Sequence, residues 1–121
     1  MKKVLVVEDD KFYSNILSMK LQKAGNGVTV VDDGQKALEE VSKNKPDLIL
    51  LDLVMPIKDG FETLEDLYKD PANKKIKVIV LTNLSQEEDK KRALDLGALD
   101  YIVKTNLSIQ QMVDVVEKNL K

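Results

Sequence analysis

The chain has 121 residues, a typical length for one domain, and its 43% hydrophobic and 33% charged residues indicate a globular rather than a disordered protein. Its 19 basic and 21 acidic residues give a net charge of -2, which offers no electrostatic basis for binding nucleic acid. The absence of cysteine and histidine excludes disulfides, thiolate nucleophiles and the commonest transition-metal ligands, so a bound metal should be a hard cation held by oxygen.

Short apolar runs alternate with segments whose apolar residues recur at helical spacing. In chain order, the pattern predicts a strand at 4–7, a helix at 11–24, a strand at 28–31, a helix at 34–43, a strand at 48–51, a loop at 55–60, a helix at 61–68, a strand at 76–81, a helix between 85 and 97, a weaker strand at 99–103 and a helix from 108 to the end. The apolar runs are typical of strands buried on both faces of a parallel sheet.

Polar residues at the ends of these segments predict where two of the helices begin. Ser85 with Glu88, and Ser108 with Gln111, have the spacing of a capping box, in which the two side chains cap each other's backbone N–H groups. Asp10 is expected to cap the first helix. We further expect Gly60 to provide a positive φ angle in the turn that it forms with Asp59.

Five strands alternating with five helices predict an α/β fold with one doubly wound, five-stranded parallel sheet of the flavodoxin-like kind. We expect the strand order 2-1-3-4-5 and a single domain over residues 1–121. Periodicity does not determine this order, but the acids that follow the first and third strands favour it, because the order places these two strands side by side.

Four of the predicted strands end in residues that can do chemistry. These are Glu8, Asp9 and Asp10 after the first strand, Asp52 after the third, Thr82 after the fourth and Lys104 after the fifth. The carboxyl ends of parallel strands meet at one edge of a sheet, so an acidic pocket should form there. Such carboxylates resist joint ionisation unless a cation joins them, and Mg²⁺ prefers oxygen ligands. A carboxylate can also accept a phosphoryl group, which a lysine and a threonine could contact.

Over its whole length, the chain resembles the receiver domain of two-component response regulators. The motifs that carry the resemblance are Val6-Val7-Glu8-Asp9-Asp10, Leu50-Leu51-Asp52-Leu53-Val54-Met55-Pro56, Asp59-Gly60, Val80-Leu81-Thr82 and Tyr101-Ile102-Val103-Lys104. No single motif is specific, but their combination in this order is.

The resemblance implies that Asp52 accepts a phosphoryl group from a phosphohistidine on a histidine kinase or phosphotransfer protein. It implies that Asp9 and Asp52 ligate Mg²⁺ directly, that the Val54 carbonyl is a third ligand, and that Glu8 holds the metal through water. The protein would then be a signalling phosphoacceptor that assists its own phosphorylation and dephosphorylation, rather than an enzyme acting on another substrate.

The resemblance also assigns a switch to the other strand ends. Lys104 would contact the phosphoryl group, Thr82 would move toward it, and Tyr101 would change rotamer in concert. The downstream target would bind the face formed by the fourth helix, the fifth strand and the fifth helix. No apolar stretch is long enough to span a bilayer, so we expect a cytoplasmic protein without membrane contacts. We also expect no direct contact with nucleic acid, and a monomer or weak dimer.

Two residues depart from the family pattern. Thr105 follows Lys104 where the family usually has a proline after a cis bond, so the Lys104–Thr105 bond is either cis or trans with an altered loop. Asn83 follows Thr82 where the family usually has a small residue. We therefore expect an altered rate of autodephosphorylation, without predicting its direction.

Other functions and other roles for individual residues remain open at this stage. A phosphatase of the haloacid-dehalogenase type also uses an aspartate nucleophile, but it needs a second aspartate at the position of Val54. A receiver-like interaction module that is never phosphorylated is another alternative. On the first helix, Tyr13 and Ile16 either belong to a wide core face or are exposed and dock the kinase.

Overall fold

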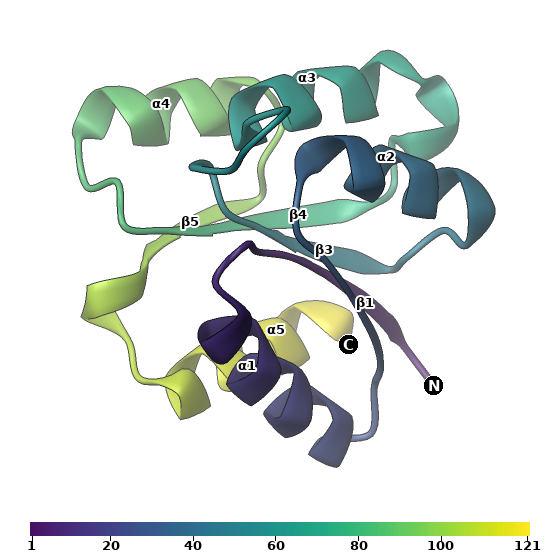
Figure 1. The fold of residues 1–121 in the computed structure, drawn as a ribbon, viewed down its shortest axis with the longest axis vertical. Helices are drawn as coiled ribbons and strands as arrows, with labels where there is room; N and C mark the ends of the chain where they lie inside the picture. Colours follow the sequence, from purple (N-terminus) through teal and green to yellow (C-terminus); the bar gives the residue numbers. More distant parts are fainter.

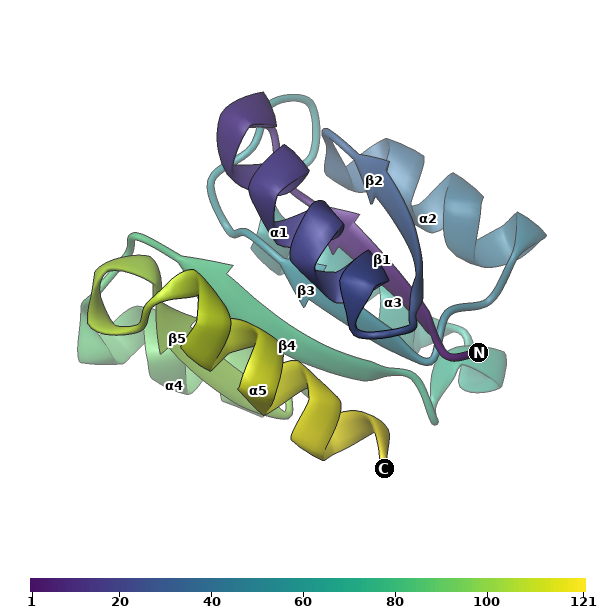
Figure 2. The ribbon, with the colours of Figure 1, turned by 90° about the horizontal axis from the view of Figure 1, so that it is seen from below.

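A computed structural model describes residues 1–121 and contains one sheet of five parallel strands in the order β2-β1-β3-β4-β5, which confirms the predicted fold class and order. The order results from pairing of β1 with both β2 and β3, and of β4 with both β3 and β5. Figures 1 and 2 show this sheet between two layers of helices. The strands are β1 (Lys3–Val7), β2 (Gly27–Val31), β3 (Leu48–Leu51), β4 (Lys77–Thr82) and β5 (Asp100–Val103).

Five α-helices cover the two faces of the sheet. Helices α2, α3 and α4 lie on one face, and α1 and α5 lie on the other (Figure 1). The helices are α1 (Lys11–Lys23), α2 (Gly34–Lys43), α3 (Gly60–Lys69), α4 (Glu87–Asp95) and α5 (Ile109–Leu120), with short 3₁₀ turns η1 (Pro71–Asn73) and η2 (Lys104–Asn106). None of these helices combines the length and the apolar character that a membrane crossing requires.

The hydrophobic core consists of two clusters, one on each face of the sheet. Along β1, Leu5 and Val7 belong to the cluster under α2, α3 and α4, whereas Val4 and Val6 belong to the cluster under α1 and α5. All four residues of β3 are buried. This arrangement explains the uninterrupted apolar runs, because successive side chains of a strand point to opposite faces and here both faces are covered.

Side-chain caps begin most of the helices, but the predicted capping box at Ser85 is wrong. Asp10 caps α1, and Ser108 forms the predicted capping box of α5. Helix α4 instead begins at Glu87, and its N-cap residue, Gln86, makes no side-chain cap. The reason lies in Leu84, just before Ser85. Its N–H donates to the Thr82 hydroxyl of β4, and its carbonyl accepts from the Tyr101 hydroxyl of β5, so the segment between β4 and α4 stays a loop.

Gly60 is required for close packing rather than for a positive φ angle, which corrects the sequence-based expectation. The Gly60 N–H donates to the Leu53 carbonyl over 3.0 Å, which brings the start of α3 against the loop that follows β3. A Cβ atom at this position would lie 2.4 Å from the Asp52 carbonyl oxygen. The strand boundaries differ from the predicted ones only slightly. Strands β4 and β5, for example, each begin one residue later than predicted.

Candidate functional site

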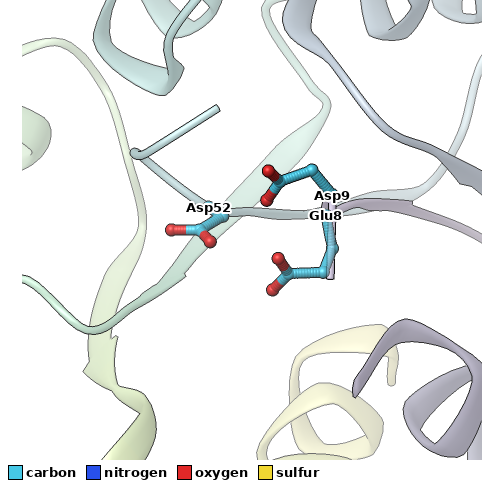
Figure 3. A group of neighbouring side chains, drawn as sticks. All are labelled: Glu8, Asp9 and Asp52. Carbon is cyan, nitrogen blue, oxygen red and sulfur yellow. The ribbon is translucent and has the colours of Figure 1, made fainter. Parts of the chain in front are cut away.

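The pairing of β1 with β3 brings the predicted acids together. Val7 lies opposite Leu51 in the parallel ladder, so Glu8 and Asp52, the next residues of the two strands, leave the sheet side by side. One carboxylate oxygen from each of Glu8, Asp9 and Asp52 lies within 4.8 Å of the others. Figure 3 shows the three carboxylates facing a shared space at this edge of the sheet.

Asp52 is almost completely buried, and both of its carboxylate oxygens have hydrogen-bond donors. The Oδ1 atom accepts from the Leu53 N–H over 2.7 Å and from the Val54 N–H over 3.3 Å. The Oδ2 atom accepts from the Lys104 ammonium over 3.1 Å. The carboxylate is therefore held in one orientation by the loop after β3 and by the end of β5.

Glu8 is 4% exposed and shares Lys104 with Asp52. Its other oxygen accepts from the Asp10 N–H over 3.1 Å. Burial raises the pKa of Glu8, and the nearby Asp52 charge adds to this rise although the hydrogen bond from Lys104 opposes it. Burial works against the charge on Lys104, but its hydrogen bond to Glu8 and the charge of Asp52 prevail and raise its pKa.

Thr82 and Tyr101 meet at a backbone group that the sequence analysis did not identify. Thr82 is fully buried, and its hydroxyl accepts from the Leu84 N–H over 3.4 Å. Tyr101 is 9% exposed, and its hydroxyl donates to the Leu84 carbonyl over 2.8 Å. Backbone atoms carry no side-chain signal, so no sequence pattern could have identified Leu84.

The two departures from the family pattern leave the charged groups in contact. No peptide bond in the chain is cis, so the Lys104–Thr105 bond is trans, and η2 follows β5. Lys104 nevertheless reaches Glu8 and Asp52. Asn83, next to Thr82, is exposed at the same edge of the sheet.

The donor set fits a hard divalent cation. Glu8, Asp9 and Asp52 offer only carboxylate oxygens, and the single ammonium of Lys104 does not balance three carboxylates. Such oxygen ligands suit Mg²⁺, which retains several of its waters. The backbone of Val54 lies next to these carboxylates, because its N–H donates to Asp52.

Helix α1 borders the site, and the exposure of Tyr13 and Ile16 lies between the two alternatives considered for them. Tyr13 and Ile16 are only partly exposed. Phe12 and Met19 are instead 77% and 55% exposed. Tyr13 turns inward, and its ring centroid lies 4.6 Å from the Lys104 Nζ atom, a contact between residues far apart in the sequence that helical spacing could not reveal.

Known proteins are similar to this chain in sequence and in fold. The family model described as the response regulator receiver domain matches residues 4–117. The chain is 36% identical over its full length to the DNA-binding dual master transcriptional regulator RpaA of Synechocystis, and it spans 50% of that relative.

Two solved structures extend the comparison. The phosphorylated cyanobacterial phytochrome response regulator RcpA is 33% identical with a TM-score of 0.84, over 97% of this chain and 89% of RcpA. The Mn²⁺-bound form of the response regulator Rcp1 is 30% identical with a TM-score of 0.86, over 98% of this chain and 93% of Rcp1.

Proposed function

The chain belongs to the response regulator receiver domain family of two-component signalling, and from this we propose that Asp52 is its phosphoacceptor. The donor would be a phosphohistidine on a histidine kinase or phosphotransfer protein. The observation that carries the proposal is the convergence of Asp52, two further carboxylates and Lys104 at one edge of the sheet. Residues 1–121 would form one receiver domain.

The proposed reaction needs a carboxylate that is ionised, oriented and close to a positive charge. An Asp52 oxygen forms a bond to phosphorus while the bond from phosphorus to the histidine nitrogen breaks, and the imidazole leaves with the electron pair of that bond. The Leu53 and Val54 N–H groups hold the carboxylate in place. Lys104, now bonded to Asp52 Oδ2, would move its hydrogen bonds to the phosphoryl oxygens as negative charge arrives.

We propose that Asp9 and Asp52 hold Mg²⁺ directly, with the Val54 carbonyl as a third ligand and Glu8 through water. A bound Mg²⁺ would neutralise the acids and the incoming phosphoryl oxygens. The buried Glu8 supports this arrangement, because a carboxylate with a pKa raised by burial needs positive charge nearby in order to remain ionised. The Mn²⁺-bound form of Rcp1 shows that a relative with this fold takes a divalent cation.

The phosphoryl group would act as a switch through Thr82, Tyr101 and the loop that joins them. The Thr82 hydroxyl can leave the Leu84 N–H and donate to a phosphoryl oxygen, which would alter the loop that Tyr101 also contacts. The face formed by α4, β5 and α5 would carry this change to a downstream target. The kinase would dock at α1 near Tyr13 and Ile16.

The dehalogenase-type phosphatase is the weaker alternative. That chemistry needs a second acid two residues after the nucleophile, and this chain has Val54 there, which has no titratable group. A signalling phosphoacceptor, rather than an enzyme with a separate substrate, is therefore the proposal that the site supports better.

Intact mass measurement tests the proposal. The protein is incubated with Mg²⁺ and acetyl phosphate, which supplies a phosphoryl group without any kinase. We expect one added phosphoryl group on the wild type and on Asp114→Asn, a control at an exposed acid of α5, and none on Asp52→Asn. Absence of an adduct on the wild type after short and long incubations would favour the unphosphorylated module, and an adduct that persists on Asp52→Asn would assign the acceptor elsewhere.

A further inference from the structure

Tyr13 makes two contacts that the proposed function does not use. Its ring faces the Lys104 ammonium, with the Nζ atom 4.6 Å from the ring centroid. Its hydroxyl donates to the sulfur of Met112 in α5 over 2.7 Å. The side chain thus joins α1, the end of β5 and α5 immediately beside the acidic site.

We propose that Tyr13 is a positioning residue for phosphoryl transfer, which holds the Lys104 ammonium against the ring face while its hydrogen bonds pass from the carboxylates to the phosphoryl group. This inference deepens the proposed function and rests on it. It concerns Lys104 and the transfer step itself, and it is separate from docking of the kinase on α1.

The nature of the contact makes it suited to this role. A cation over an aromatic ring is attracted to the ring electrons and not to a hydrogen-bond acceptor, so the contact leaves the N–H donors of Lys104 that face the carboxylates available. Two of its bonds now go to Glu8 and Asp52. When the negative charge of a phosphoryl group arrives, the ammonium can exchange these acceptors without leaving the ring.

Burial makes the attraction effective. The Lys104 side chain is only 11% exposed, so little water competes with the ring for the ammonium. Cation–π attraction is stronger when both partners are desolvated. Without the ring, the four-carbon stem of a lysine has many rotamers, and the Lys104–Thr105 bond that follows it is trans where the family usually has a rigid cis-proline.

The ring of Tyr13 packs against the core under α1 and α5, and this packing holds it in its orientation. Met112 is 2% exposed and belongs to the core under α1 and α5, so it offers a stationary partner. Burial, followed by the charges of Glu8 and Asp52, raises the pKa of Tyr13 to about 12, so its hydroxyl can donate even at alkaline pH. The bond to Met112 adds to the packing of the ring, whose face is directed at Lys104.

Two substitutions separate the ring from the hydroxyl. Tyr13→Phe keeps the ring and loses the bond to Met112, whereas Tyr13→Leu keeps apolar packing and loses the π face. Tyr68→Leu is the matched control, since Tyr68 is also partly buried and its hydroxyl bonds to the Ile76 carbonyl far from the acids. Each variant is phosphorylated with acetyl phosphate and Mg²⁺, and the acetylation rate of Lys104 by an amine-reactive ester is measured by peptide mass spectrometry.

We expect Tyr13→Leu to lower the phosphorylation rate constant about three- to tenfold and to raise Lys104 acetylation by a similar factor. Tyr13→Phe and Tyr68→Leu should stay within about twofold of the wild type in both measurements. Rescue by phenylalanine separates ring positioning from a general packing defect, which would also appear in Tyr68→Leu.

Two results would overturn the inference: a Tyr13→Leu variant with wild-type phosphorylation and acetylation rates, or a Tyr13→Phe variant as impaired as Tyr13→Leu. If the wild type takes no phosphoryl group, the proposed function fails. Lys104 acetylation still reports on the contact with Tyr13 in that case, so the two failures can be distinguished.

Discussion

Replacement of Lys104 by methionine should expose how much the acidic site depends on its one ammonium. In Lys104→Met, a side chain of similar length keeps the packing but leaves Glu8 and Asp52 without their shared cation. Both carboxylates remain buried, and Glu8 is only 4% exposed. We therefore expect the metal-free variant to be less stable than the wild type at pH 7.5.

The magnitude follows from the cost of an unpaired buried charge. Removal of one partner of a fully buried ion pair costs about 3–5 kcal/mol. This site lies at the edge of the sheet, where Asp9 is exposed and water is close, and Glu8 can take up a proton. We therefore expect a smaller loss of about 2 kcal/mol in the free energy of unfolding.

The loss should depend on pH with a defined sign. The folded-state pKa of Glu8 is already above its ordinary value of 4.5, mainly because of burial, and loss of Lys104 raises it further. Between the unfolded and folded pKa values, the native state binds more protons, so stability falls as the pH rises through this window. The difference between variant and wild type should therefore shrink as the pH is lowered toward 4.5.

Urea denaturation at pH 7.5 and pH 5, with and without Mg²⁺, measures these effects. Lys36→Met is the control, since Lys36 pairs with Asp32 over 2.8 Å at the exposed surface, and its loss should change the free energy of unfolding far less than the loss of Lys104 does. Mg²⁺ should restore part of the stability of Lys104→Met by replacing the lost charge. Equal stability of Lys104→Met and wild type at pH 7.5 in metal-free buffer would refute this reasoning.

Four further predictions concern the same edge of the sheet. Gly60→Ala should cost roughly 1–3 kcal/mol in urea denaturation, because the new Cβ meets the Asp52 carbonyl, and stability like that of the wild type would contradict this. Asn83→Ala should change the rate at which phosphorylated protein loses its phosphoryl group, followed by intact mass, and an unchanged rate would show that Asn83 is irrelevant. Mg²⁺ at ten times its Kd should raise the free energy of unfolding of the wild type by about 1.4 kcal/mol, and the same Mg²⁺ concentration should stabilise Asp9→Asn much less. In absorbance titrations, Tyr13 and Tyr101 should ionise near pH 12 rather than pH 10, because burial raises their pKa values. The folded state then binds more protons than the unfolded state between these two pH values, so the free energy of unfolding should fall as the pH rises above 10. Titration of both residues near pH 10 would argue against their burial.

Much of this protein could be predicted from the sequence because the signals are local. Apolar runs such as Leu48–Leu51 identify strands buried on both faces, and acids placed directly after them identify the functional edge of the sheet. The helix caps at Asp10 and Ser108 could be predicted equally well, since a cap depends on residues only three positions apart. The family motifs then indicated that Asp52, Thr82 and Lys104 act together at that edge.

Features that depend on contacts between distant segments could not be predicted from the sequence. Ser85 has the spacing of a cap, yet Leu84 is held by Thr82 and Tyr101, so α4 begins later. Gly60 looks like a turn glycine, but its small size is needed because the loop after β3 packs against it.

By itself, the sequence determined the alternation of strands and helices, the doubly wound sheet and the residues at its acidic edge, because periodicity, caps and motifs act over a few positions. Only the tertiary structure decided that Lys104 is shared between Glu8 and Asp52 and lies over the ring of Tyr13. These contacts depend on the packing of α1 and β5 around the sheet, where residues far apart in the chain come within a few ångströms, and no local pattern encodes that distance.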